Sequence, residues 1–326
     1  MNQKVYDAEY ERDLLKYFDG LLPVKIYDAH FHLSRDYTQR SGYQGAPFMQ
    51  YTEFMEKYLG RHISGGMVMP SPSSKHTAET LADENAYNLT VAEEHNLEAG
   101  LIVTPGCGRE ATEKKLEKFP RIRVLKPYFC YSLKENTFES DILDFAPEWM
   151  WSLAHDRKMP ILVHLSHYQN MLNDPQNWGQ IRYLCEKYPD AKLILAHCAM
   201  GHHVRKLRLG LEHISDLKNI WLDCSGSAET MSIYYCLKTF GVNRMLYGGD
   251  YYYAATIGRI CSFGSNFIGF HLGYVKEEAI PGDYKYQPLN NGQECLLALL
   301  EACELLQLSR KDMEKIFYDN AAQLFC

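Results

Sequence analysis

The sequence has no apolar stretch of the ~20 residues that a helix needs to cross a bilayer. Residues 1–20 mix charged and apolar side chains, which is not typical of a signal peptide. No run of basic residues occurs, and the formal net charge of −7 argues against a nucleic-acid-binding surface. These absences predict a cytoplasmic protein that binds neither membranes nor nucleic acids.

The ten cysteines include no C-x-x-C pair, so their spacing does not indicate a disulfide framework or a cysteine-based metal site. Most of them lie in or beside apolar runs, where a free thiol packs as a small hydrophobic group. Reduced thiols are typical of cytosolic proteins, which agrees with the predicted location.

The chain also has no Pro-, Gly- or Ser-rich linker that would divide it. Its 326 residues are 46% hydrophobic, which is enough for a large core. Because an α/β barrel takes about 250 residues plus insertions, residues 1–326 are predicted to form one domain.

Strand-like and helix-like segments alternate along the chain, which predicts a parallel sheet, and eight such units predict a closed (β/α)8 TIM barrel. An amphipathic helix is expected before the first strand, at 5–18, and a helical extension after the last, at 292–306 and 309–325. The segment 251–291 is expected to be irregular. Helices are also expected at 77–95, 109–119, 141–157, 176–188, from 201 and at 229–240. The strand-like runs are 24–32, 64–70, 98–105, 121–129, 160–165, 192–198, 219–225 and 244–250.

Five of these runs end in side chains that can bind a metal or carry charge. In order they are the pair His30 and His32, then Lys126, His164, His197 and Asp250. Alternate residues of a strand point to the same side, so His30 and His32 share a face. Neutral imidazole and carboxylate groups are ligands that zinc accepts. Because active sites of such barrels lie at the carboxyl ends of the strands, fold and chemistry predict one site on one face.

Each of these residues also has a simpler interpretation. A single His-x-His pair is often incidental, and a single buried histidine is often structural. Asp28 shares the face of His30, where it could accept a hydrogen bond from a ligand histidine or could simply bind backbone. Asp250 follows two glycines and could instead cap a turn. Lys126 is interpreted as an unmodified ammonium group that pairs with the carboxylates around it or binds an anionic substrate.

Cationic and polar loop residues are candidates for substrate binding. Arg35, Arg40, Arg205 and Arg259 fall in loops on the predicted active face, where a guanidinium group could bind a substrate carboxylate. The predicted substrate is therefore a small anionic molecule. The candidates at this face also include His167, His202 and His203.

The complete set resembles the amidohydrolase superfamily, in particular its amidohydrolase 2 branch of metal-dependent hydrolases and decarboxylases. The motifs that carry the resemblance are DAHFH (28–32), LDCSG (222–226), RMLYGGDYY (244–252) and the ending DNAAQLF (319–325). The sequence departs from the branch at Gly249, where Ser or Thr is common.

The resemblance implies roles for individual residues. It implies that His30, His32, His164 and Asp250 hold one divalent metal, with zinc expected first and manganese or iron as alternatives. His197 is then the group that orients or deprotonates water, and Asp250 could share the proton transfer. In some related barrels a lysine at the place of Lys126 is carbamylated and bridges two metals.

The expected activity is hydrolysis of an amide, lactone or ester of a small carboxylated molecule. The alternatives are decarboxylation of an unsaturated or aromatic acid, a metal-free lactonase or isomerase, and a barrel that only binds its ligand. A homo-oligomer is compatible with the sequence.

Overall fold

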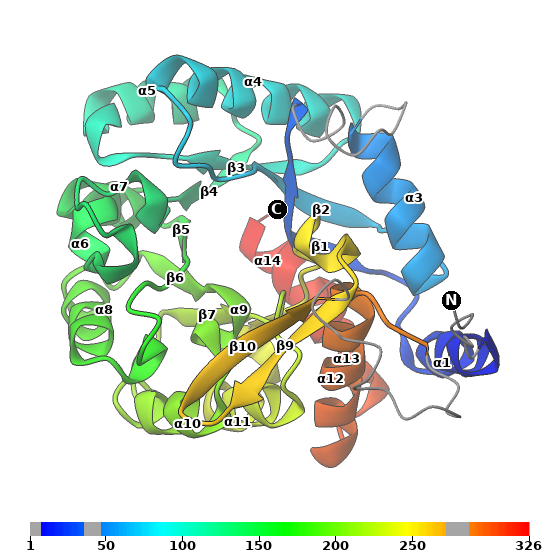
Figure 1. The fold of residues 1–326 in the computed structure, drawn as a ribbon. Coiled ribbons are helices and arrows are strands. Elements are labelled where there is room, and N and C mark those ends of the chain that lie inside the picture. The colour runs from blue at the N-terminus through cyan, green and yellow to red at the C-terminus, as the bar shows by residue number, and fades with distance from the viewer. Residues whose placement is uncertain (1–7, 36–46, 272–286, 326) are drawn as a thin grey trace, which may run out of the picture.

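The computed structural model describes residues 8–35, 47–271 and 287–325. Eight parallel strands follow one another around a barrel in their order along the chain, which confirms the predicted TIM barrel (Figure 1). A parallel neighbour can be reached only by a crossover connection, so helices lie outside the barrel. The strands are β1 (Tyr27–Leu33), β2 (Gly65–Pro70), β3 (Glu98–Ile102), β4 (Ile122–Lys126), β5 (Pro160–Val163), β6 (Lys192–Leu195), β7 (Ile220–Asp223) and β8 (Met245–Leu246).

Hydrogen bonds between β1 and the chain that follows β8 close the barrel. The backbone N–H of Ala29 donates to the carbonyl oxygen of Tyr247 over 2.9 Å. The N–H of Asp250 donates to the carbonyl oxygen of His30 over 2.7 Å. Asp250, the last expected metal ligand, is therefore hydrogen-bonded directly to β1, the strand that carries the first two expected ligands.

The helices confirm the predicted alternation, including the opening helix α1 (Ala8–Leu21) and the helical C-terminal part. Residues 5–7 of the predicted opening helix lie outside the described residues. The other helices are α3 (Pro47–Leu59), α4 (Ala78–Glu94), α5 (Arg109–Lys118), α6 (Ile142–Phe145), α7 (Glu148–Asp156), α8 (Pro175–Lys187), α9 (Ala196–Met200), α10 (Val204–Glu212), α11 (Thr230–Phe240), α12 (Asn291–Leu305), α13 (Arg310–Glu314) and α14 (Asn320–Phe325), with a π-helical turn at Lys315–Asp319.

Two helical predictions differ from the structure. Helix α3 was not predicted from the sequence. The predicted helix 141–157 is two helices, α6 and α7, because Pro147 lies between them and proline cannot continue a helix without losing a backbone hydrogen bond.

The largest difference is an antiparallel hairpin in the segment predicted to be irregular. Strands β9 (Gly258–Phe263) and β10 (Asn266–His271) pair with Phe263 opposite Asn266, which leaves a two-residue turn. Gly264 in that turn has a φ of +60°, a conformation typical of tight hairpin turns. The hairpin lies across the face of the barrel, in front of the strands (Figure 1).

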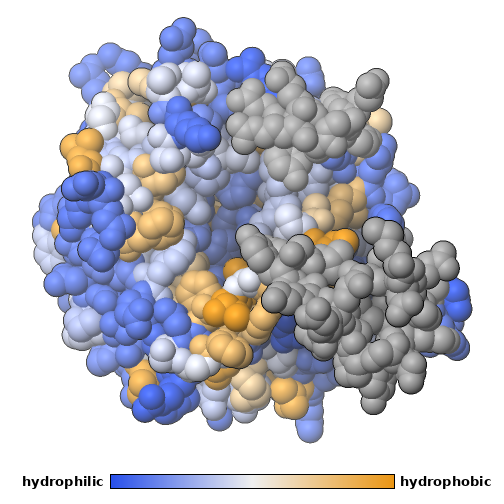
Figure 2. All heavy atoms as spheres, viewed as in Figure 1, coloured by the Kyte–Doolittle hydropathy of each residue, from blue (hydrophilic) through white to orange (hydrophobic). Residues whose placement is uncertain are grey.

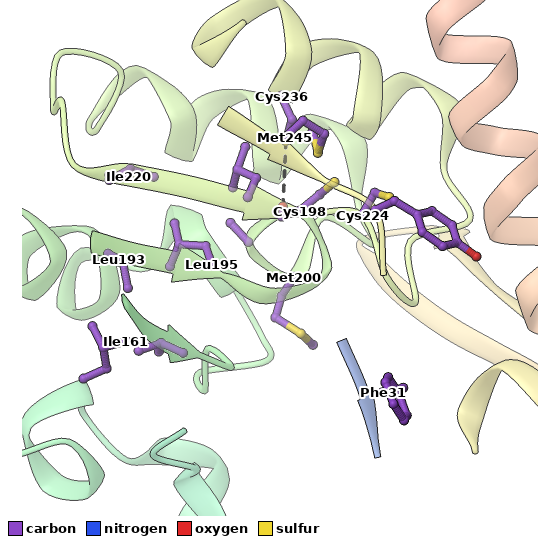
Figure 3. Packing of buried hydrophobic residues seen from close by; sticks show 14 of the residues in the cluster. Phe31, Ile161, Leu193, Leu195, Cys198, Met200, Ile220, Cys224, Cys236 and Met245 are labelled. Carbon is purple, nitrogen blue, oxygen red and sulfur yellow. Dashed lines mark hydrogen bonds between the residues drawn. The ribbon is translucent and has the colours of Figure 1, made fainter. Parts of the chain in front are cut away.

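Apolar side chains fill the barrel and the layer between strands and helices (Figure 3). The interior cluster includes Met67, Leu162 and Ile194, and α14 adds Phe325. The ring of Phe325 stacks on Tyr27 at 6.0 Å, at the start of β1, so the C-terminal helix packs against the amino end of the barrel. That packing leaves the carboxyl end available for a site.

The described residues give two further results. No helix in the described ranges has both the length and the apolar character needed to cross a membrane. The cysteines of those ranges are free thiols, as their spacing predicted.

Candidate metal centre and active site

A cavity of about 370 Å³ opens at the carboxyl ends of the barrel strands. It lies beneath the hairpin, whose apolar side chains gather on the molecular surface in the same view (Figure 2). The cavity is lined by His30, His32, Ser71, Pro72, Tyr128, His164, Tyr168, His197, Met200, His202, Gly226, Asp250, Tyr251, Tyr252, Tyr253, Ile260 and Phe267.

The two histidines of β1 present nitrogen lone pairs to the same point. The Nδ1 atom of His30 lies 3.1 Å from Asp223 Oδ2, and that of His32 lies 2.8 Å from the carbonyl oxygen of Pro70. Both Nδ1 atoms therefore carry the proton, and both Nε2 atoms are acceptors. These two Nε2 atoms are 3.1 Å apart. Two lone pairs repel at that distance unless a cation lies between them.

The separation fits a metal ion. Two ligands of a tetrahedral zinc with Zn–N bonds of 2.0–2.1 Å lie about 3.3 Å apart. Asp250 Oδ1 lies 4.0 Å from Nε2 of His30 and 3.8 Å from Nε2 of His32. The three side chains thus form a group of close ligand atoms that could hold a cation. Burial lowers the pKa of both histidines, so the rings are neutral, as metal ligation requires.

His164, the fourth expected ligand, lines the same cavity but is not part of this close group. Its Nδ1 atom lies 3.1 Å from the carbonyl oxygen of Leu165, so its Nε2 atom is the free acceptor. Its ring centroid is 5.0 Å from that of His197. The structure therefore brings together three of the four expected ligands and places the fourth beside them.

His197 lies in α9, which directly follows β6 and is a left-handed turn instead of a regular α-helix. Residues 197–200 all have positive φ values, between 51° and 57°, although none of them is glycine. The left-handed conformation costs about 1–2 kcal/mol per residue. The turn is held by the backbone N–H of His197, which donates to Asp223 Oδ1 over 3.3 Å, and by the N–H of Gly201, which donates to the carbonyl oxygen of His197.

The orientation of the His197 ring is fixed by a hydrogen bond to the backbone. Its Nδ1 atom lies 2.8 Å from the carbonyl oxygen of Ser225, so Nδ1–H donates and Nε2 remains an acceptor. Asp250 Oδ2 lies 4.0 Å from His197 Nδ1. Gly226, with a φ of +61°, passes close by, and a Cβ atom there would lie 3.0 Å from the ring. Only glycine fits this position without displacing the histidine.

Asp223 is the functional residue that the sequence interpretation missed. It ends β7, is fully buried and binds three groups of the site: the ring of His30, the N–H of His197 and the N–H of Ser225. These partners hold its pKa below the usual range although burial opposes them, so it stays ionised. It follows the apolar run IWL at a strand end, which was the signal that identified the other residues.

Asp28 was considered as a partner for a ligand histidine, but the structure gives it other partners. It accepts hydrogen bonds from the backbone N–H of His30 and of Gly249 and from the hydroxyl of Tyr51. The ring of His30 binds Asp223 instead. A Cβ atom on Gly249 would lie 2.7 Å from the Asp28 carboxylate, which explains why this chain departs from Ser or Thr there.

Lys126 is fully buried and does not line the cavity. Among the described residues its Nζ atom has no hydrogen-bond partner, and it lies 5.4 Å from the ring of Tyr128. Burial lowers the pKa of Lys126 to about 8, opposed by the charges of Asp223 and Asp250. The residue therefore contributes positive charge beneath the site.

Three of the arginines expected to bind substrate, Arg35, Arg205 and Arg259, do not line the cavity. Arg35 lies on the surface near Asp83 and Glu84, and Arg205 is exposed. Arg259 binds Glu294 over 3.1 Å and the carbonyl oxygen of Ala228 over 2.7 Å. Arg40 lies outside the described residues. Arg205 lies in α10 and Arg259 lies in β9, so neither is in the loop that the sequence predicted. The acidic neighbours of Arg35 and Arg259 could not be identified from sequence.

The three loop histidines have different surroundings. His167 binds Asp141 over 3.1 Å, and the Nδ1 atom of His203 accepts the N–H of Lys206 at the start of α10. Only His202 lines the cavity, where it is 3% exposed.

A model of the amidohydrolase family, in its second branch, matches residues 27–325. The chain belongs to the amidohydrolase family. No curated protein matches it significantly.

Solved structures with the same fold share little sequence with this amidohydrolase. A zinc-bound amidohydrolase from Burkholderia multivorans has a TM-score of 0.58 at 12% identity, covering 93% of this chain and 99% of the other. A putative 2-pyrone-4,6-dicarboxylic acid hydrolase from Pseudomonas putida gives 0.54 at 14% identity, with 93% and 98% coverage. A 2,6-dihydroxybenzoate decarboxylase gives 0.55 at 10% identity, with 92% and 99% coverage. These similarities show the fold.

The neutral, buried histidines of the amidohydrolase site predict acid instability. Burial lowers the pKa of His202 to about 3, so between pH ~6.5 and ~3 the unfolded chain binds a proton there that the folded protein does not. The stability present above pH ~6.5 is therefore lost as the pH falls, by up to about 1.4 kcal/mol per pH unit for one such group. For His202→Phe, the free energy of unfolding is measured in urea with a chelator present. Between pH ~4 and ~5.5 it should depend on pH less steeply than in the wild type, by the equivalent of one bound proton. An unchanged slope would contradict the prediction.

Proposed function

We propose that this amidohydrolase is a metal-dependent hydrolase that cleaves an amide, lactone or ester of a small, anionic molecule. The observation that carries the proposal is the pair of Nε2 lone pairs of His30 and His32, 3.1 Å apart and within 4.0 Å of Asp250 Oδ1. We further propose that the protein acts in the cytoplasm. We also propose a homo-oligomer, which a measurement of mass in solution tests.

The roles of the residues follow from their atoms. His30, His32 and Asp250 would hold the cation, with His164 as the fourth candidate. When bound, such a cation supplies Lewis-acid chemistry, because it polarises a carbonyl group and lowers the pKa of water toward ~7.

His197 would act as the general base. Its Nε2 atom is free to accept a proton from water, and its Nδ1–H is held by the carbonyl oxygen of Ser225, which stabilises the protonated ring. Asp223 keeps His30 in the tautomer that presents Nε2 and holds the backbone of the turn that carries His197.

The proposal predicts one metal ion per chain. The described residues contain one close group with free Nε2 atoms. The other possible group among them, His30, His197 and Asp223, has both its histidines committed through Nδ1–H. Elemental analysis of protein purified without chelator should give about one divalent ion per chain. Two ions with a modified Lys126 would refute the mononuclear site, and failure to bind zinc, manganese or iron would favour the metal-free alternatives.

Decarboxylation is a second candidate, favoured by the walls of the cavity. Five tyrosines and Phe267 line it, and flat aromatic surfaces suit an unsaturated or aromatic acid. One structural neighbour is a 2,6-dihydroxybenzoate decarboxylase, which supports the same candidate.

Product analysis separates the two reactions. The metal-loaded protein would be incubated with a panel of carboxylated lactones, amides and aromatic acids. Release of carbon dioxide from an acid, with no cleavage of the lactones, esters or amides, would replace hydrolysis by decarboxylation. Preference for uncharged members of the panel would contradict the proposed anionic substrate.

A further inference from the structure

The cavity contains buried polar atoms that the hydrolytic roles do not use. The Nδ1 atom of His202 and the hydroxyl of Tyr253 have no hydrogen-bond partner among the described residues. Both residues line the cavity. A buried polar group without a partner destabilises the folded protein, so such groups in a binding site indicate a missing partner.

The position of His202 shows which part of a ligand it would meet. The ring of His197 lies 5.2 Å from that of His30 and 6.3 Å from that of His202, with interplanar angles of 26° in both pairs. The ring of His202 lies in turn 5.1 Å from Phe267 of the hairpin. A row of rings thus leads from the metal ligands to His202. A small molecule that reacts beside His30 would place its far end at His202.

The surroundings of His202 favour an uncharged group over a second carboxylate. Burial is the largest cause of the lowered pKa of His202, and the nearby His197 lowers it further, so the ring is neutral near pH 7. No lysine or arginine among the described residues lines the cavity. A neutral imidazole offers one donor and one acceptor, which matches a hydroxyl, a carbonyl or an amide group.

We propose that His202 is a specificity-determining residue that hydrogen-bonds an uncharged polar substituent at the end of the substrate remote from the metal. The hairpin supports this subsite. The hydroxyl of Ser262 on β9 donates to the carbonyl oxygen of His202 over 3.2 Å, and Phe267 on β10 packs on its ring. The inference rests on the proposed function only in placing the reacting end of the substrate at the metal.

The test uses probes instead of a known substrate. Binding of 2-, 3- and 4-hydroxybenzoate is measured by calorimetry beside that of the matching methylbenzoates, which have a similar shape but no hydrogen-bonding group. For at least one position, the wild type should bind the hydroxyl probe about tenfold more tightly than its methyl partner. That probe, and not its partner, should shift the ring ¹⁵N resonances of His202.

Three variants separate the hydrogen bond from packing. His202→Phe keeps a ring beside Phe267 but has no polar atoms, so the preference for the hydroxyl probe should disappear while the methyl probe binds as before. His202→Gln should restore part of the preference. Phe267→Leu should weaken the binding of both probes equally and leave the ratio of their dissociation constants unchanged. No preference in the wild type, or a preference that persists in His202→Phe, would overturn the inference.

Metal content measured on the same samples distinguishes this inference from the proposed function. A metal-loaded protein without the hydroxyl preference refutes the role of His202 and leaves the hydrolase proposal intact. A protein that takes up no metal but shows the His202-dependent preference and ¹⁵N shift refutes metal dependence and supports the subsite.

Discussion

Replacing His197 with asparagine is expected to lower turnover by about 10²–10⁴-fold while the metal content stays at the wild-type level. General acid–base groups typically contribute this factor. Retention of metal is expected because His197 directs its Nδ1–H to Ser225, and it is absent from the close group formed by His30, His32 and Asp250. Asparagine is the suitable replacement because it tolerates the left-handed conformation of residue 197, whose φ is 56°.

The measurement combines turnover, metal content and thermal unfolding of the same preparation. A melting temperature close to that of the wild type would show that the turn is intact and that the lost rate belongs to the side chain. If His197→Asn released the metal, His197 would be a ligand. If it kept full activity, the histidine would be structural.

Replacing His32 with asparagine is expected to reduce the metal content from about one ion per chain to nearly none and to abolish activity. His32 supplies one of the two facing Nε2 atoms, and an asparagine side chain is too short to place an atom there. His32 is preferred to His30 for this test because, outside the proposed metal-binding group, its ring hydrogen-bonds one described residue, at the carbonyl oxygen of Pro70, whereas His30 also binds Asp223 and Ser225. The variant therefore disturbs fewer buried contacts.

His164→Asn is the matched comparison for this variant. The family resemblance predicts that it also loses metal, while the structure places His164 beside the close group and not within it. The dissociation constants for zinc of the two variants show whether loss of the His164 ring weakens metal binding as much as loss of the His32 ring. A fully loaded, fully active His32→Asn would contradict the proposed metal centre.

Much of this site could be predicted because its residues share a position that sequence shows directly. His30 and His32 lie in β1, Lys126 ends β4, His164 directly follows β5, and Asp250 follows β8 by four residues. Parallel strands bring their carboxyl ends together. Asp223 has the same signal and was missed because LDCS was considered only as a family motif. Its role depends on contacts with His30 and His197, which are far away in the sequence.

Other features depend on tertiary contacts that no local pattern contains. The hairpin was missed because residues 251–291 are rich in Tyr and Gly, although Gly264 and the alternation in GRICSF were signals for it. The predicted loop residue Arg259 lies on β9 of the hairpin, and packing decides whether its side chain turns toward the cavity or toward Glu294. Packing also decides that His202 lines the cavity and the neighbouring His203 does not.

The left-handed turn at 197–200 has a consequence for when the active geometry forms. Cys198 points into the apolar layer, near Cys224 and Met245, and the thiol of Cys236 lies 3.9 Å from the carbonyl oxygen of Cys198 (Figure 3). The strained backbone is thus held by the core and needs no ligand to hold it. The histidine should therefore have the same position in the metal-free and the loaded protein. Its preorganisation is completed during folding, so substrate binding requires no rearrangement of the base.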